Sequence, residues 1–123
     1  CLSRGSQKVT FIEDYSKVLT ILKKNISSLN CDEKTRIIKK NILDKKTLIS
    51  LAGTFDIIFM DPPYKEKKLS ELIKTILVLN LLKKNGIIII HRHKKEKGDF
   101  PKEFKILKEN SYGISKIIFA EKI

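Results

Sequence analysis

The pattern of hydrophobic positions is clearest between Phe55 and Met60, where apolar residues follow one another with a single interruption at Asp56. Such a short, nearly continuous run is typical of a strand that is buried on both faces of a parallel sheet. A second run, residues 87–90, consists of isoleucine alone and predicts another strand that is covered on both sides. We expect the first of these strands to lie at the centre of an open α/β sheet.

Two other segments carry apolar residues at helical spacing. The first follows a predicted strand at residues 8–12, and its apolar residues are Val18, Leu19, Leu22, Ile26 and Leu29. The second covers residues 69–82, and its predicted core face consists of Leu69, Leu72, Ile73, Ile76, Leu77 and Leu81. Apolar residues three and four positions apart form one stripe on a helix, so each helix is expected to bury that stripe.

Weaker signals complete the order of elements. Residues 2–5 indicate the last turn of a helix closed by a glycine, residues 36–39 predict a strand, and residues 47–52 predict a weak helix that ends at Gly53. The charged residues 94–102 predict a loop. Residues 104–107 and 115–120 predict an antiparallel hairpin at the sheet edge, because turn-forming residues lie between them. This order predicts one α/β domain over residues 1–123.

The loop after Met60 carries the strongest chemical signal, Asp61-Pro62-Pro63-Tyr64. Proline has a fixed φ and no backbone N–H, so the strand must stop here and a rigid loop must follow. Open α/β sheets bind their ligands at the carboxyl ends of strands. A carboxylate, carbonyl acceptors and an aromatic ring suit a flat group that bears an amine. The alternative for this motif is a plain proline turn whose Asp61 caps a helix.

A second acid, Glu13, lies at the end of the predicted strand at residues 8–12. An acid in this position commonly accepts the hydroxyl groups of a cofactor ribose. The neighbouring Asp14 is a candidate for the helix N-cap. The alternative for the Glu13–Asp14 pair is capping and compensation of the helix dipole alone.

The amino-acid composition narrows the classes of protein to which the chain could belong. No apolar run approaches the about 18 residues that cross a membrane, and we expect a cytoplasmic protein. Cys1 and Cys31 are too few for a disulfide framework, and no metal-ligand spacing appears. The formal net charge of +12 suits an RNA partner. However, the positive residues are almost all lysine, which codon bias in an A+T-rich genome would also produce.

Several short matches lie in a fixed order along the chain. They are residues 2–5, 9–13, 22–26, 36–38, Asn41, residues 61–64, Tyr112 and Gly113. In this combination the chain resembles the bacterial 16S ribosomal RNA guanine-N2 methyltransferases of the RsmD type. The resemblance implies S-adenosylmethionine as the cofactor and a Rossmann-like class I methyltransferase sheet with the strand order 3-2-1-4-5-7-6.

The resemblance also implies roles for individual residues. Glu13 would bind the ribose of the cofactor and Asn41 would approach its adenine. The loop Asp61-Pro62-Pro63-Tyr64 would hold the target guanine, with Asp61 at the cofactor as well.

The sequence departs from the family pattern in two places. His91 stands after residues 87–90, where the family often has an acid. The family's first strand and its glycine-rich loop come before the part that matches residues 2–5, and the chain has no such pattern. We therefore expect an incomplete sheet, the carboxyl-terminal portion of the domain, in which residues 8–12 and 55–60 are not joined. Lost backbone pairing of about 1–3 kcal/mol per buried group would destabilise that sheet.

The main hypothesis is methylation of a guanine N2 amine in small-subunit ribosomal RNA, by an active enzyme or its truncated remnant. A DNA adenine-N6 methyltransferase is an alternative, because the same loop serves that amine. A non-catalytic, lysine-rich RNA-binding fragment is the alternative of another class. Cofactor binding distinguishes the fragment from both enzymes.

Overall fold

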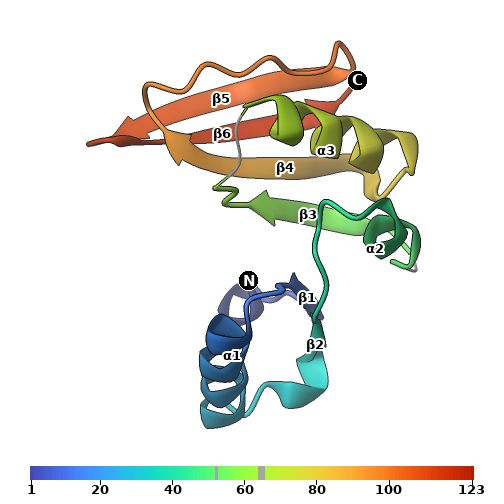
Figure 1. Cartoon of the computed structure of the whole chain (residues 1–123), viewed down its shortest axis with the longest axis vertical. Helices are drawn as coiled ribbons and strands as arrows, with labels where there is room; N and C mark the ends of the chain where they lie inside the picture. Colours follow the sequence, from blue (N-terminus) through green and yellow to red (C-terminus); the bar gives the residue numbers. More distant parts are fainter. Residues whose placement is uncertain (52, 64–65) are drawn as a thin grey trace. The chain divides into compact units, whose positions relative to one another are not determined.

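The computed structural model describes residues 1–51, 53–63 and 66–123 (Figure 1). It forms two compact units, Cys1–Thr47 and Leu48–Ile123, and each contains its own sheet. The elements in chain order are the 3-10 helix η1 (Leu2–Arg4), strand β1 (Val9–Ile12), helix α1 (Ser16–Ser28), the 3-10 helix η2 (Asp32–Lys34), strand β2 (Thr35–Ile38), helix α2 (Lys45–Ile49), strand β3 (Phe55–Met60), helix α3 (Glu66–Val78), strand β4 (Leu82–His93), strand β5 (Phe104–Tyr112) and strand β6 (Ser115–Lys122).

The first unit is a parallel pair of strands beside one helix. β1 and β2 pair from Val9 opposite Thr35 to Ile12 opposite Ile38, and α1 connects them. Helix α1 buries Leu19 and Ile26. The predicted stripe was too wide, because Val18 and Leu29 are 43% and 74% exposed. A helix that covers only two strands buries a narrow strip of its surface.

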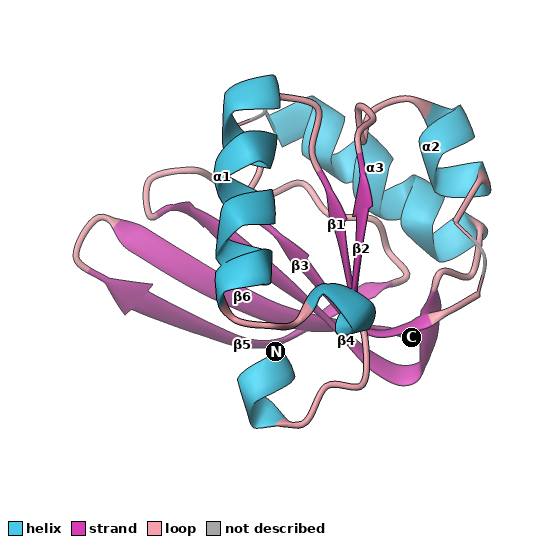
Figure 2. Cartoon of the chain, turned by 90° about the horizontal axis from the view of Figure 1, so that it is seen from below, coloured by secondary structure: helices cyan, strands magenta, loops and turns pink. Residues whose placement is uncertain are grey.

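The second unit has a four-stranded sheet in the order β3-β4-β6-β5 (Figures 1 and 2). β3 and β4 are parallel, whereas β4 pairs with β6 and β6 with β5 in antiparallel fashion. The predicted hairpin at the sheet edge is therefore confirmed, with Gly113 at a positive φ of 58° in its turn. A positive φ is strained for a residue with a Cβ, which explains a glycine at this point.

Helix α3 and the sheet form the core of the second unit. The prediction that six residues of the segment 69–82 are buried is confirmed, because all six are at most 5% exposed: Leu69, Leu72, Ile73, Ile76, Leu77 and Leu81. The first five lie on α3, whereas Leu81 follows the end of the helix at Val78. The apolar side chains that the strands of the sheet bury include Met60, Leu82, Ile88, Ile90, Phe104, Ile118 and Ala120. Along β4 and β6, buried residues alternate with more exposed ones, so one face of the sheet is buried.

The prediction that residues 55–60 are buried on both faces is wrong for this structure. Ile57 and Phe59 are 54% and 60% exposed, although Met60 is buried. β3 is the edge strand of its sheet, and in the described part of this unit α3 covers one face only (Figure 1). Ile88 and Ile90 on β4 are fully buried, while their neighbours Ile87 and Ile89 are half-buried.

The boundary between α3 and β4 also differs from the prediction. Leu82 belongs to β4, where it pairs with Phe55, and the ladder then shifts register before Ile57. Asn85 has a positive φ of 65° inside this irregular stretch. A Cβ on Gly86 would lie 2.8 Å from Leu82 Cδ1 and 2.9 Å from the Lys83 carbonyl oxygen. Glycine is therefore required for a bulge inside a strand, rather than for a connection before it.

The predicted fold class is confirmed. The pair β2-β1 corresponds to the 3-2 part of the class I methyltransferase order, and β3-β4-β6-β5 corresponds to 4-5-7-6. The described residues contain no strand that corresponds to strand 1 of that order. The chain is thus a mixed α/β protein with an incomplete Rossmann-like sheet.

Candidate functional site

Asp61 follows the carboxyl end of β3 and lies beside His91, which is near the carboxyl end of the parallel strand β4. Met60 is opposite Ile90 in the register of β3 and β4, so the next residues of both strands are neighbours. His91 Nδ1 and Asp61 Oδ1 are 2.9 Å apart. A carboxylate only accepts hydrogen bonds, so the Nδ1–H of His91 donates to it. The two residues form a pair in which the ring fixes the direction of the carboxylate.

The Asp61 carboxylate remains accessible although one of its oxygens is bound. Its side chain is 64% exposed, whereas the His91 side chain is 34% exposed. Pro62 is half-buried and Pro63 is exposed, and no strand continues beyond Met60. Tyr64, the fourth residue of the predicted loop, lies outside the described residues. The described part of the loop presents an oriented hydrogen-bond acceptor at the end of a strand.

Glu13 follows β1, and its carboxylate contacts the backbone of the next two residues. Glu13 Oε1 accepts the backbone N–H groups of Asp14 and Tyr15, each at 3.0 Å. The N-cap of α1 is Tyr15, so the predicted N-cap at Asp14 is wrong. Both N–H groups precede the first helical residue, Ser16, so Glu13 fixes the turn before α1 and does not cap the helix. Its predicted contact with a ribose stays a prediction.

Asn41 lies in the exposed turn after β2. Its Oδ1 accepts the backbone N–H of Leu43 at 2.9 Å, and its carbonyl oxygen accepts the Thr47 hydroxyl at 2.9 Å. These bonds fix the turn and the position of Asn41 within it. Glu13 and Asn41 both follow strands that run parallel, and Ile12 is opposite Ile38. The structure therefore places both residues at the carboxyl ends of the two strands of the smaller sheet.

His91 is the candidate that the sequence pattern did not select. A histidine at a strand end is usually only solvated, and nothing in the sequence joined it to Asp61. The available signal was the pair of apolar runs that end at Met60 and Ile90, because parallel strands in that register bring their next residues together.

Two features are absent from the described residues. They contain no group of three or more His, Cys, Asp or Glu residues that could hold a metal ion. Among the same residues, no helix has the length and apolar character to span a membrane.

Comparisons with known proteins agree with the fold. Ribosomal RNA small subunit methyltransferase D of Haemophilus influenzae is 33% identical over 114 residues, which are 92% of this chain and 59% of the relative. The chain thus spans less than two thirds of that relative. The crystal structure of protein HI0767 of H. influenzae superposes with a TM-score of 0.82 at 30% identity, over 99% of this chain and 76% of the other.

A more distant structure was solved with a ligand. Podospora anserina methyltransferase PaMTH1, bound to SAH, superposes with a TM-score of 0.61 at 25% identity, over 72% of this chain and 36% of the other. The family model described as Conserved hypothetical protein 95 matches residues 1–121, nearly the whole chain. The resemblance to the RsmD-type methyltransferases is confirmed, and the chain belongs to the Conserved hypothetical protein 95 family.

Proposed function

We propose that this chain is the base-holding part of an S-adenosylmethionine-dependent methyltransferase that methylates the N2 amine of a guanine in 16S ribosomal RNA. The observation that carries the proposal is the oriented Asp61 carboxylate at the carboxyl end of β3, at the start of an Asp-Pro-Pro-Tyr loop. The methyltransferase D relative supports the choice of small-subunit RNA as substrate. Such a substrate implies work in the cytoplasm, on ribosomal RNA or on the small ribosomal subunit.

Asp61 has a direct part in the proposed reaction. S-adenosylmethionine supplies an activated methyl group when it is bound. Asp61 accepts a hydrogen bond from the guanine N2 amine and offsets the positive charge that develops on the nitrogen as it becomes bonded to carbon. The base must leave its stack to reach the loop. His91 keeps the Asp61 carboxylate in one orientation, so the amine meets an acceptor that is already in place.

The remaining loop residues provide further contacts with the base. A carbonyl oxygen in the Pro62 region accepts a hydrogen bond from the second N–H of the amine, and the prolines offer no competing N–H donor. Tyr64 stacks on the base, an interaction worth about 1–3 kcal/mol. Asp61, Pro62, Pro63 and Tyr64 are thus the proposed catalytic set.

Glu13 and Asn41 are the residues that would hold the cofactor. Both lie at the carboxyl edge of the β1–β2 pair, where a carboxylate and an amide suit ribose hydroxyls and an adenine edge. The hydrogen bonds of Glu13 Oε1 and Asn41 Oδ1 to the backbone hold both side chains in place. A carboxylate and an amide of this kind fit the ribose and adenine parts of the cofactor.

Analysis of the methylated product tests the proposal. The protein that carries this sequence is incubated with isotopically labelled S-adenosylmethionine and small ribosomal subunits that lack the modification. The RNA is then digested to nucleosides and separated by mass. We expect label in N2-methylguanosine. Label in N6-methyladenine of added DNA would favour the DNA methyltransferase instead, and RNA binding without any cofactor binding would favour a non-catalytic fragment.

A further inference from the structure

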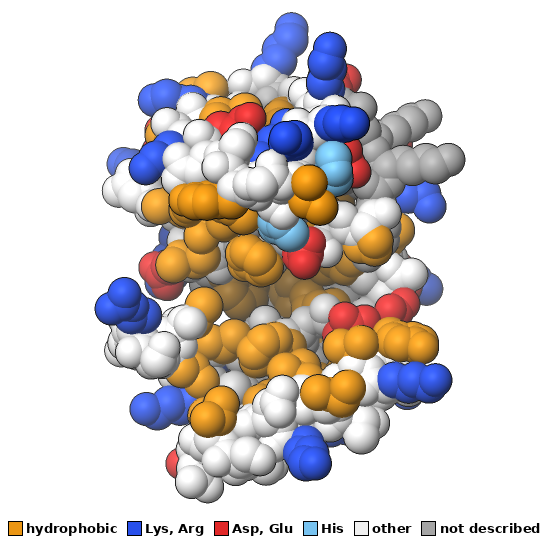
Figure 3. All heavy atoms as spheres, turned by 90° about the vertical axis from the view of Figure 1, so that its left-hand side faces the viewer, with side chains coloured by type: hydrophobic (Ala, Val, Ile, Leu, Met, Phe, Trp, Pro, Cys, Tyr) orange, Lys and Arg blue, Asp and Glu red, His pale blue; other side chains and the backbone are white. Residues whose placement is uncertain are grey.

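The turn that follows β4 carries three lysines beside the proposed base site. Lys94, Lys95 and Lys97 are all exposed, and they begin one residue after His93, the end of β4. We call them the lysine turn. Figure 3 looks at the strand ends on the left of Figure 1 and shows lysine and arginine side chains next to one of the two histidines of the chain. Among the described residues, no ion pair joins these three lysines to an acid.

Backbone hydrogen bonds hold this turn in one shape. Lys94 N–H donates to the Ile114 carbonyl at 2.7 Å, and Glu96 N–H donates to the His93 carbonyl at 3.0 Å. The Lys95 N–H donates to His93 Nδ1 at 3.1 Å. The turn is therefore tied to the end of β4 and to the hairpin between β5 and β6.

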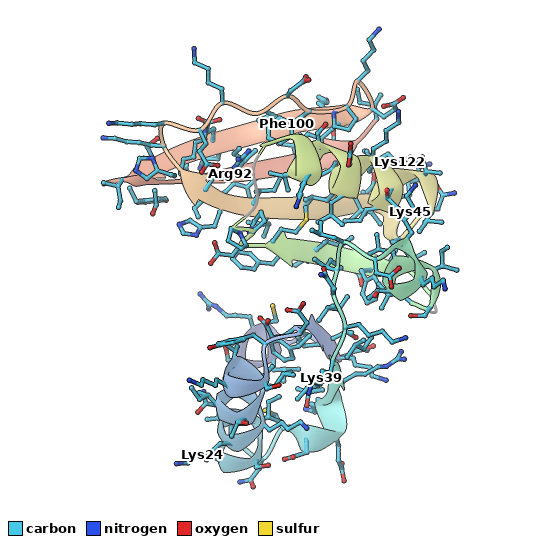
Figure 4. The ribbon with its side chains drawn as sticks, viewed as in Figure 1. Lys24, Lys39, Lys45, Arg92, Phe100 and Lys122 are labelled. Carbon is cyan, nitrogen blue, oxygen red and sulfur yellow. The ribbon has the colours of Figure 1, made fainter. Side chains whose placement is uncertain are left out.

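The only acid in the turn is neutralised from within the protein. Arg92, whose side chain is 2% exposed, forms an ion pair with Glu96 through Nη2. The buried Lys116, opposite Arg92 on β6, donates from Nζ to the Glu96 carbonyl at 2.5 Å. The Glu96 charge is thus already compensated, and the positive charge of the lysine turn faces solvent uncancelled. Figure 4 labels Arg92 on β4.

The lysine turn lies close enough to the proposed base site to contact phosphates on either side of a bound nucleotide. Lys94 is three residues beyond His91, and an extended chain rises about 3.3 Å per residue, so about 10 Å separates the turn from the Asp61–His91 pair. Phosphates along one strand lie about 3.4 Å apart along a helix axis, so about three of them fit that distance. Lysine side chains on a fixed backbone suit contacts with those phosphates.

We propose that Lys94, Lys95 and Lys97 bind the backbone phosphates that flank the base taken up by the Asp61 loop. The inference rests on the proposed function for the identity of the strand as RNA. The contacts are independent of base identity, because phosphates carry no sequence information. They would hold the strand while Asp61 selects the amine.

An RNA-binding measurement tests the proposal. The probe is a fluorescein-labelled RNA stem-loop of about 20 nucleotides with guanine in its loop, and its fluorescence anisotropy is measured at several KCl concentrations. The triple variant Lys94→Gln, Lys95→Gln, Lys97→Gln is compared with Lys17→Gln, Lys23→Gln, Lys24→Gln on α1. These α1 lysines are exposed, and Figure 4 shows Lys24. Each triple removes three positive charges from the formal net charge of +12. A third variant replaces the turn lysines by arginine and keeps the charge.

The turn variant should bind at least about tenfold more weakly at 0.1 M KCl, and its slope of log affinity against log salt should be shallower by about 2. The α1 variant should lose less than about threefold, because its lysines make none of the proposed phosphate contacts and add only to the net charge. The arginine variant should bind like the wild type. Equal losses in both glutamine variants, unchanged binding by the turn variant, or loss in the arginine variant would overturn the proposal.

The nucleoside assay separates failure of this inference from failure of the proposed function. Wild-type protein that makes N2-methylguanosine, together with a turn variant that binds RNA normally, overturns the phosphate role alone. Conversely, lost RNA binding in the turn variant with no methylated guanosine from the wild type supports the phosphate role and contradicts the proposed reaction.

Discussion

At the residue scale, the proposed chemistry depends on one pair of side chains. The carboxylate of Asp61 is mostly exposed, so without His91 it would sample several orientations in water. The 2.9 Å hydrogen bond from His91 Nδ1 limits those orientations at a position where the family often has an acid. We infer that His91 acts through Asp61 and is a positioning residue.

Replacing His91 by Ala should lower the single-turnover rate of methyl transfer about fivefold, which corresponds to a hydrogen bond of about 1 kcal/mol. His91→Asn should retain most of the rate, because its amide N–H can occupy the place of Nδ1–H. Cofactor affinity should stay the same in both variants. Rates that fall equally in the Ala and Asn variants would contradict the positioning role.

Tyr64 offers a second prediction at this scale. Tyr64→Phe should retain methyl transfer and Tyr64→Ala should lose it, because stacking on the base needs the ring and is worth about 1–3 kcal/mol. A single-turnover assay with saturating cofactor measures both. Should Phe prove as poor as Ala, the hydroxyl group rather than the ring would carry the role.

The sequence identified Asp61 but not its partner, for a physical reason. Two prolines after an apolar run determine where a strand stops, and this information is local. The contact between Asp61 and His91 depends on the register of two strands that are thirty positions apart. Glu13 shows the same limit, because the sequence did not indicate that its carboxylate would accept the backbone N–H groups of Asp14 and Tyr15.

At the scale of elements, α3 holds the second unit together. Five of the six predicted core residues lie on α3 and are buried, because helical periodicity alone decides which residues share a face; Leu81, the sixth, is buried after the helix. Burial of β3 could not be predicted in the same way. An all-apolar strand shows only that both faces could be buried, whereas neighbouring elements decide whether Ile57 and Phe59 are covered. The bulge at Asn85 and Gly86 likewise depends on pairing with β3.

Ile73→Ala should lower the free energy of unfolding by about 2–5 kcal/mol, because Ile73 is fully buried and the change leaves a cavity. Val78→Ala on the same helix is the control. Val78 is 70% exposed, so its change should stay within about 0.5 kcal/mol. Urea unfolding followed by circular dichroism measures both. Equal effects would mean that α3 is not packed on the sheet as described.

At the scale of the whole molecule, each parallel pair has an edge strand with no second neighbour among the described residues. β1 pairs with β2 alone, and β3 pairs with β4 alone. The described residues contain no counterpart of strand 1 of the class I order, whose glycine-rich loop would approach the cofactor. In the proposed site, Glu13 and Asn41 would contact only the ribose and adenine ends of the cofactor. Cofactor binding by these 123 residues should therefore be weak.

Calorimetric titration of the purified chain with S-adenosylmethionine should give a dissociation constant of about 1 mM or weaker, which is about 4 kcal/mol. A co-expressed segment that supplies an apolar strand and a glycine-rich loop should tighten binding. Micromolar affinity of the chain alone would show that its sheet is completed in another way, and would contradict the incomplete-sheet interpretation.

The central claim is that Asp61 holds the target amine, and the variant Asp61→Ala tests it most directly. Single-turnover methyl transfer to small ribosomal subunits is measured for the protein that carries this sequence, with its cofactor affinity titrated in parallel. We predict that transfer falls about 100-fold or more, as for other groups that stabilise charge in a transition state, while cofactor affinity stays nearly unchanged. Transfer at the wild-type rate, or a loss of cofactor affinity equal to the loss of rate, would contradict the account.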